Sequence, residues 1–325
     1  MGSLLTAFLL FLGLLGVAMG DNNQTHVPPN VPPKAADKPA KKPVTHPELN
    51  ANLSPALFEH LPPTWGSWKG WASGWIPKPC REAAEKHHLN PWEMEVYSVK
   101  YTDCDEPWTI CRHYKDSISI AKMAETFGNI PIGMREYFGT IVTLPDLGGP
   151  VGLTYLEAGL PVIQFLYGWF IESVLIHEIS HVLDTQIPNE YGHGRFSNTS
   201  VWKGNYSLDA AAVTRYSLTN WSENFAEASI AALYDLVVPG GLANVTADAK
   251  SVSHVVSTYK HALGDIIKPR SKPKCTKRWR NAEIVPVSDK RVPPYPPLDV
   301  SIKSSSVTQM ENASKGTIMN CTLPH

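Results

Sequence analysis

The apolar positions of this chain gather into a few segments, separated by polar stretches rich in proline or glycine. The longest segment, 161–186, is apolar on nearly every side, which predicts a buried central helix that begins again near Gly168. Upstream, the apolar positions of 113–127 predict another helix. Gly139–Leu144 predicts a short strand, a candidate for the sheet edge along which an extended peptide pairs.

The second half of the chain is predicted to be mainly helical. The alanine-rich stretch 223–234 predicts a helix that starts near Ser222, and 248–263 predicts a further helix. The polar stretch 188–207 is expected to be an exposed loop. We therefore expect an α+β fold in which a small sheet with an edge strand lies over the central helix and a mainly helical half follows.

The two ends of the chain differ from this central part. Residues 1–20 form an apolar run that ends in small residues, as a cleaved signal peptide does, and its apolar core of about 12 residues is too short to cross a bilayer. Residues 21–65 hold ten prolines and four lysines and predict an extended, disordered linker. We expect a folded domain at 66–270 and an irregular tail at 271–325.

The charges balance, since 29 basic side chains face 30 acidic ones, and nothing in this balance favours nucleic acid as a partner. A signal peptide with no later transmembrane segment predicts a secreted, extracellular protein. Eight Asn-x-Ser/Thr sequons agree with a glycoprotein. They begin at Asn23, Asn52, Asn198, Asn205, Asn220, Asn244, Asn312 and Asn320.

Five cysteines remain after the signal peptide, which in an oxidising compartment predicts two disulfides and one odd thiol. The sequence does not determine the pairing. Cys104 and Cys111 are close enough to close a small loop, and Cys275 and Cys321 would fix the tail to the domain. The fifth cysteine is Cys80.

Four tryptophans fall close together at the start of the domain, at Trp65, Trp68, Trp71 and Trp75. If buried, they anchor the domain through their large apolar area; if exposed, their rings stack on sugars. Burial is the commoner use of tryptophan, so we expect the anchoring role.

The central segment carries the candidate chemistry, because it contains His177-Glu178-Ile179-Ser180-His181. Residues four apart lie on one face of a helix, so His177 and His181 can hold one metal ion. Glu178 lies close enough to reach a water bound to that metal. This pattern is typical of zinc metallopeptidases, in which the carboxylate is the general base. The alternative is a buried helix with two core histidines and no metal.

A catalytic zinc site uses three protein ligands and keeps one position for water. The metzincin pattern requires a glycine and a histidine three and six residues after His181, where Asp184 and Ile187 stand, so it is excluded. A downstream Gly-Thr-x-Asp, as in deuterolysins, is also absent. A glutamate in a Glu-x-x-Ala pattern on a second helix is present as Glu223-Asn224-Phe225-Ala226. Glu223 is therefore the predicted third ligand of Zn²⁺.

Taken together, these motifs resemble the catalytic domain of anthrax lethal-factor-like metallopeptidases over residues 130–240. The resemblance rests on 177–184 and 223–228, and on Tyr216, which precedes the glutamate by the spacing that the family shows. The whole chain is also similar to secreted fungal proteins first named for conidiation, with its proline-rich start and the segment 130–135.

The lethal-factor resemblance implies a zincin-like fold and hydrolysis of peptide bonds in a peptide or protein substrate. It also implies that Tyr216 donates a hydrogen bond to the oxyanion. Asp184 and Glu227 are candidates for orienting the ligating histidines by accepting their other N–H groups. Asn220 is a sequon immediately before the predicted cleft, and we expect it to be unmodified because a glycan there would crowd Glu223.

The second reading of the sequence is a protein without catalysis. Such a secreted protein would keep zinc for stability and bind cell-wall polysaccharide, or another partner, through its tryptophan-rich surface. Replacement of Trp68 and Trp71 in a cell-wall binding assay would separate this reading from a peptidase.

Overall fold

The computed structural model describes residues 38–148, 151–157, 160–166, 168–187, 194–269, 274–276, 278–290 and 319–321. The expected signal peptide, the first part of the linker, and the sequons at Asn23 and Asn312 lie outside the described residues. Among the described residues, no helix has both the length and the apolar character needed to cross a membrane.

The strands are β1 (Gly66–Gly70), β2 (Trp75–Pro77), β3 (Met94–Tyr101), β4 (Trp108–His113), β5 (Thr140–Leu144), β6 (Gly152–Glu157), β7 (Leu160–Leu166), β8 (Ile284–Pro286) and β9 (Met319–Cys321). The α-helices are α1 (Ser54–His60), α2 (Lys78–Lys86), α3 (Ile120–Asn129), α4 (Ile132–Arg135), α5 (Glu172–Leu183), α6 (Ser200–Leu208), α7 (Trp221–Val237) and α8 (Ser253–Leu263). Short 3₁₀ helices are η1 (Ala51–Leu53), η2 (Pro91–Glu93), η4 (Phe196–Asn198), η5 (Tyr216–Leu218), η6 (Gly241–Asn244), η7 (Ala247–Val252) and η8 (Gly264–Ile266).

The described strands form a seven-stranded sheet in the order β1-β3-β4-β5-β7-β6-β9 and a separate pair, β2 with β8. β4, β5 and β7 are parallel, whereas β6 is antiparallel to both β7 and β9. The predicted strand at Gly139–Leu144 exists as β5, but its expected place at the edge is wrong, because β5 is paired on both sides. The strand that contacts α5 most is β6.

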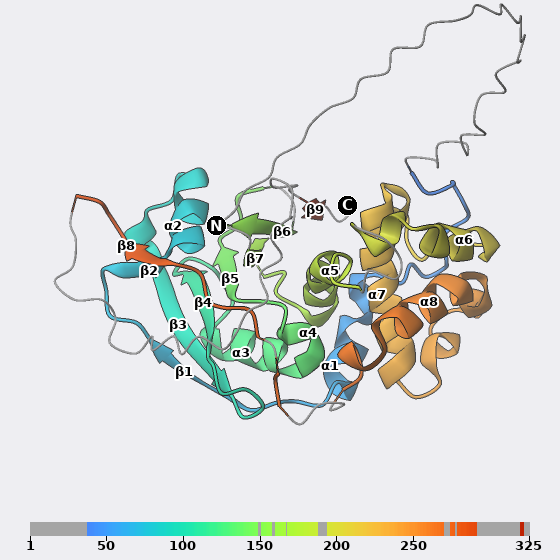
Figure 1. Cartoon of the computed structure of the whole chain (residues 1–325), viewed down its shortest axis with the longest axis horizontal. Coiled ribbons are helices and arrows are strands. Elements are labelled where there is room, and N and C mark those ends of the chain that lie inside the picture. The colour runs from blue at the N-terminus through green and yellow to red at the C-terminus, as the bar shows by residue number, and fades with distance from the viewer. Residues whose placement is uncertain are drawn as a thin grey trace, which may run out of the picture. The chain divides into compact units, whose positions relative to one another are not determined.

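Both faces of the sheet are covered (Figure 1). Alternate residues of each central strand point to opposite faces, so that Ile163 of β7 joins the large core under the helices while Val162 joins a smaller one under α2 and the β2–β8 pair. The second half of the chain is mostly helical, with α5, α7 and α8 packed together. The mixed α+β class and the helical second half are therefore confirmed.

The predicted central helix over 161–186 is wrong in its first part, because Leu160–Leu166 is the strand β7 and the helix α5 begins only at Glu172. All seven residues of β7 are buried. A strand buried on both faces is a continuous apolar run without period two, and such a run cannot be told from a buried helix by its pattern.

The exposed loop expected over 188–207 is wrong in its second part, because Ser200–Leu208 is helical. The side chain of Thr199 accepts a hydrogen bond from the backbone N–H of Trp202 and caps this helix. The helix buries Trp202 and Tyr206, two residues that lie four apart on one face.

The disordered linker expected over 21–65 is wrong for its described part, residues 38–65. This part contains α1, and a stripe of leucines at intervals of four is buried there: Leu49, Leu53, Leu57 and Leu61. The backbone N–H of Thr45 also donates to Ala212. Apolar side chains at helical spacing outweigh the local excess of proline and lysine, because they contribute apolar area to the core.

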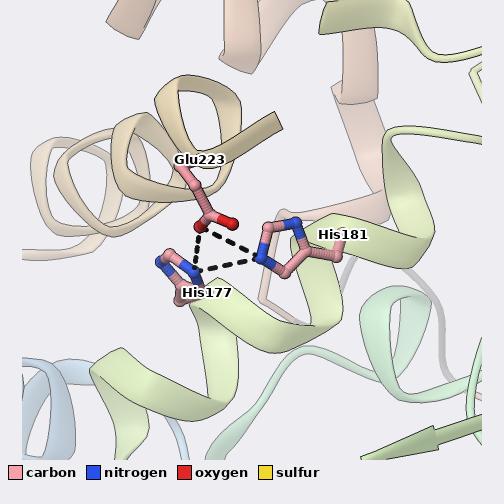
Figure 2. Close-up of side chains that lie close together, drawn as sticks. All are labelled: His177, His181 and Glu223. Carbon is pink, nitrogen blue, oxygen red and sulfur yellow. Dashed lines mark hydrogen bonds and ion pairs between the residues drawn. The ribbon is translucent and has the colours of Figure 1, made fainter. Parts of the chain in front are cut away.

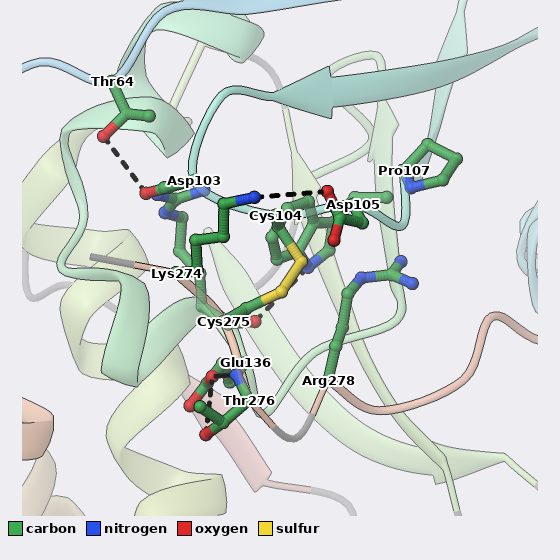
Figure 3. Close-up of a disulfide and its surroundings, with 12 residues drawn as sticks. Thr64, Asp103, Cys104, Asp105, Pro107, Glu136, Lys274, Cys275, Thr276 and Arg278 are labelled. Carbon is green, nitrogen blue, oxygen red and sulfur yellow. Dashed lines mark hydrogen bonds and ion pairs between the residues drawn. A yellow bond between two sulfur atoms is a disulfide. The ribbon is translucent and has the colours of Figure 1, made fainter. Parts of the chain in front are cut away.

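Within the described part of the chain there are two disulfides, and both differ from the pairs that sequence spacing suggested. Cys80 is bonded to Cys111, and Cys104 is bonded to Cys275. The first joins α2 to β4 across the smaller core. The second fixes the segment after η8 to the turn between β3 and β4 (Figure 3). Next to Cys275, Thr276 donates to Glu136 at the end of α4.

The tryptophan cluster is not buried as expected. Trp65 is 81% exposed and Trp68 is 45% exposed, whereas Trp71 and Trp75 are half-buried. β1 is an edge strand of the large sheet, so its outward residues meet solvent. Among the described sequons, the asparagines at Asn52, Asn198 and Asn244 are exposed.

Candidate metal centre

The helix α5 brings the two histidines together. It is buried along its whole length, between the sheet and α7. Glu172 lies in its first turn and His181 in its last turn. His177 and His181, one turn apart, present their rings side by side at 4.8 Å between ring centres.

The helix α7 supplies the carboxylate. Its first turn begins after Asn220, whose side-chain oxygen accepts a hydrogen bond from the backbone N–H of Glu223 at 2.9 Å. This cap fixes the start of α7, and with it the position of Glu223 against the histidines on α5.

The three side chains converge on one point (Figure 2). Nε2 of His177 lies 3.1 Å from Nε2 of His181 and 3.1 Å from Oε2 of Glu223. The third side of the triangle, from Nε2 of His181 to Oε2 of Glu223, is 3.4 Å. Their side chains are 1%, 0% and 3% exposed. This is a buried set of two nitrogens and one oxygen.

The dimensions of this triangle fit zinc. Two donor atoms about 2.1 Å from one tetrahedral centre lie about 3.4 Å apart, and the three sides measured here are 3.1, 3.1 and 3.4 Å. Two imidazoles and one carboxylate are also the donor set of many catalytic zinc sites. The residues present therefore fit a zinc ion with one position left open.

The electrostatics at Glu223 favour its charged form. Burial by itself raises the pKa of a carboxyl group, but the two imidazoles that face Oε2, His181 and His177, outweigh it and hold the pKa of Glu223 well below its usual range. An ionised carboxylate facing two imidazole nitrogens is the state in which all three groups can bind a cation.

Glu178, the residue after His177 on α5, lies against β6. Burial raises its pKa, even though His177 and His181 are close. The hydroxyl of Thr154 on β6 lies 2.6 Å from its Oε2 and donates to it. Its Oε1 has no hydrogen-bond partner among the described residues. A Cβ atom at Gly152 would lie 2.4 Å from Oε1, so glycine leaves the space that this carboxylate fills.

Glu227 lies behind His177. Its Oε1 is 2.8 Å from Nδ1 of His177, the nitrogen that points away from Glu223. The corresponding nitrogen of His181 faces a hydroxyl instead: its Nδ1 is 3.1 Å from Oγ of Ser222, which in turn accepts a hydrogen bond from Arg195.

The sequence suggested that Asp184 orients a ligating histidine. In the structure, Ser222 and not Asp184 lies at the outer nitrogen of His181. It is fully buried and accepts hydrogen bonds from the backbone N–H and the hydroxyl of Ser197, both at 2.7 Å. Arg195 lies 3.7 Å from it. Asp184 therefore closes the loop after α5 and holds Arg195, which reaches Ser222.

Tyr216 lies beside the histidines in η5, with its ring centre 6.1 Å from that of His177. The side chain of Asn224 joins α7 to both η5 and α6. It donates to the backbone carbonyl of Ser217 in η5 and accepts from the indole N–H of Trp202 in α6. The Tyr216 side chain is half-buried.

A family comparison matches this chain over residues 47–290 to the model described as conidiation-specific protein Con-13. The chain belongs to the Con-13 family. Among curated proteins, conidiation-specific protein 13 of Neurospora crassa is 30% identical over 183 residues, which cover 55% of this chain and 52% of that protein. The chain thus spans about half the length of the curated relative it matches.

Among solved structures, the chain is similar to a proposed zinc-binding metallo-peptidase from Bacteroides caccae ATCC 43185, with 15% identity and a TM-score of 0.27. The match covers 47% of this chain and 64% of that one.

Three residues near the candidate metal centre were not predicted from sequence: Thr154, Ser222 and Arg195. Thr154 lies on a strand far from the motif in the chain, and the sequence contains no local signal for its contact with Glu178. Ser222 had a local signal, since it directly precedes Glu223. Arg195 falls in the stretch that had been predicted to be an exposed loop.

Proposed function

We propose that this protein is a secreted, zinc-dependent metallopeptidase. The observation that carries the proposal is the buried triangle of His177, His181 and Glu223, whose donor atoms and separations suit zinc. The adjacent Glu178, with one carboxylate oxygen unpartnered in the described part of the chain, supports a catalytic use of the site over a purely structural one.

In this proposal His177, His181 and Glu223 hold the ion. When bound, zinc would polarise a water molecule and the carbonyl of a peptide bond. Glu178 accepts the proton of the attacking water at Oε1 and passes it to the leaving amine. Thr154 keeps the other carboxylate oxygen in place through its hydroxyl. Tyr216, half-buried beside His177, donates to the oxyanion.

Secretion is part of the proposal. Two disulfides agree with an oxidising compartment, where such bonds persist. The expected signal peptide at residues 1–20 and the unmodified state of Asn220 remain predictions. Asn220 serves as the cap of α7, and a glycan on it would stand beside Glu223.

The test is zinc content followed by peptide cleavage. The mature secreted protein is expected to carry about one zinc per chain by elemental mass spectrometry. Glu223→Ala should lose most of it, and the exposed-site control Glu59→Ala should not. Glu178→Gln should keep the zinc and lose cleavage of a mixed peptide library. Absence of zinc from protein purified without chelators would refute the proposal.

A second candidate function is polysaccharide binding, and a specific cavity favours it. A hollow of about 300 Å³ lies between the β1–β2 connection and β3, and Trp71, Trp75, Trp92 and Tyr97 line it. Trp92 is 42% exposed. Aromatic faces of this kind stack on sugar rings.

Binding to insoluble chitin and β-glucan tests the second candidate. The protein with Trp71 and Trp92 replaced by alanine should lose retention if the hollow binds sugar, and Trp65→Ala, outside the hollow, is the matched control. Trp68→Ala with Trp71→Ala extends the test to β1. Equal retention of all variants would remove this candidate without touching the zinc site.

A further inference from the structure

The strand β6 is the part of the sheet that meets the candidate base. Gly152 and Thr154, two residues apart on β6, both lie against Glu178: the first leaves space for its Oε1 and the second donates to its Oε2. Residues two apart in a strand share a face. This face of β6 therefore lies against the turn of α5 that carries the motif.

The two edges of β6 are both in use. On one side β6 pairs with β7, and on the other it pairs antiparallel with β9, close to the end of the chain. The register sets Cys321 opposite Gly152 and Met319 opposite Thr154. The C-terminal strand thus takes the positions across from the two β6 residues that meet Glu178.

An exposed sheet edge offers a row of backbone N–H and C=O groups, and an extended peptide binds by adding a strand to that row. The outer edge of β6 can accept only one such strand. A peptide held there and the segment Met319–Cys321 therefore compete for the same backbone groups.

We propose that the C-terminal segment of this chain is an intramolecular occupant of the peptide-binding edge, and that it must leave β6 before another extended peptide can bind. A second part of this inference, that the freed edge of β6 binds a peptide that is then cleaved, rests on the proposed function. The first part, the competition for β6, does not.

A tethered strand is a strong competitor even when its own affinity is low. Because it is part of the same chain, it acts at an effective concentration of about a millimolar. Suppose that the same segment, as a free peptide, binds β6 with a dissociation constant of about 100 µM. The tethered strand then weakens the apparent binding of that free peptide about ten-fold. The difference between a chain with and without the paired strand is therefore measurable.

The experiment compares two full-length variants at one position. The carbonyl of Val151 bonds to Leu166 of β7, so the next residues along, Gly152 and Thr154, turn their backbone groups toward β9, where Cys321 and Met319 lie opposite them. Met319→Pro removes one of the backbone donors of β9 and breaks the ladder. Met319→Ala keeps the backbone, and both variants leave the sequon at Asn320 intact. The probe is a fluorescent peptide of residues 316–325 carrying C321S, and binding is measured by anisotropy.

The peptide should bind Met319→Pro about ten-fold more tightly than it binds wild-type protein or Met319→Ala. Hydrogen exchange should show the amides of Gly152 and Thr154 losing protection in Met319→Pro alone, with α5 and α7 unchanged. Equal peptide binding by all three proteins, or no binding by any, overturns the proposal, as does equal protection of β6. If Met319→Pro also loses protection in α5, Cys321→Pro replaces it in the same comparison.

Peptide hydrolysis then separates this inference from the proposed function. If the zinc-loaded protein is a peptidase, Met319→Pro should have a lower KM than Met319→Ala for an extended peptide, with a similar kcat. Tight peptide binding by Met319→Pro without any cleavage would support the competition for β6 and refute the peptidase.

Discussion

Oε1 of Glu227 lies 2.8 Å from Nδ1 of His177, on the side of the ring opposite the nitrogen that faces Glu223. Both partners are almost fully buried. A carboxylate in this position selects the tautomer whose Nε2 lone pair is free to bind a cation, and it raises the basicity of the ring. The two glutamates of α7, one turn apart, thus serve His177 from opposite sides.

Replacing Glu227 tests this arrangement. Glu227→Gln should weaken zinc binding roughly 10- to 100-fold, because the amide orients the ring without stabilising its positive charge. Zinc affinity is measured by competition with a chromogenic chelator. Glu59→Gln, at an exposed position, should leave the affinity unchanged. An unaltered zinc affinity in Glu227→Gln would mean that the contact is only structural.

Thr154 should affect catalysis and not metal binding. Thr154→Val removes the hydroxyl that donates to Glu178 while keeping the shape of the side chain. We expect kcat to fall about ten-fold, part of the 10²- to 10⁴-fold that a general base contributes, with zinc content unchanged. Thr154→Ser keeps the hydroxyl and should retain most activity. Similar rates for Val and Ser would show that this hydrogen bond does not position the base.

Asp184 should matter to stability. Asp184→Ala leaves the backbone N–H and the hydroxyl of Ser197 without their acceptor in a buried site. The free energy of unfolding should fall by about 2–4 kcal/mol, the cost of losing two hydrogen bonds to a charged group. Urea unfolding measures it. Ser197→Ala loses only one of the two bonds and should cost less; an equal cost would show that the hydroxyl bond carries the whole contribution of Asp184.

Glu172 should make the protein less stable as the pH rises. Burial raises the pKa of this carboxyl group, and its Oε1 has no partner among the described residues. The folded state therefore binds the proton more tightly than the unfolded state. Stability is highest below the unfolded pKa, and it falls as the pH rises through the raised folded pKa.

Glu172→Gln removes this titration. The variant should match the wild type at pH values below the ordinary pKa of glutamate, and it should exceed the wild type in free energy of unfolding at neutral pH. Urea unfolding across a pH series gives both values. If the difference between the two proteins did not change with pH, the buried carboxyl would not be the cause.

The two disulfides should contribute unequally. Cys104–Cys275 spans 171 residues and Cys80–Cys111 spans 31. Loop-closure entropy then predicts losses of about 5 and about 4 kcal/mol when each pair is replaced by alanine. Chemical unfolding of the two double variants measures the difference. A larger loss for the shorter loop would indicate that packing of the buried Cys80 and Cys111, and not chain entropy, dominates.

The metal triangle was accessible from sequence because its information is local. Helical spacing places His177 and His181 on one face, and the Glu-x-x-Ala pattern singles out Glu223. The structure brings these three together, and their role as ligands stays a prediction. The contacts of Thr154 and the pairing of Cys104 with Cys275 join segments far apart in the chain, and no local pattern encodes them.

Two errors about the fold have different physical causes. β7 was taken for part of a helix because burial on both faces removes the period-two pattern. The ordered segment 38–65 was missed although a signal existed, since Leu49, Leu53, Leu57 and Leu61 recur every four residues. There the count of prolines and lysines had been given more weight than the spacing of the apolar side chains.

The pairing of β2 with β8 also bears on how the protein is made. Trp75–Pro77 can complete their strand pair only with Ile284–Pro286, and Val287 belongs to the same small core as Ile76. During synthesis, the part of the smaller core that the β2–β8 pair covers stays exposed until almost the entire described domain has left the ribosome. Nascent chains shorter than this would expose apolar surface, so chaperone capture before release is the expected fate of a stalled chain.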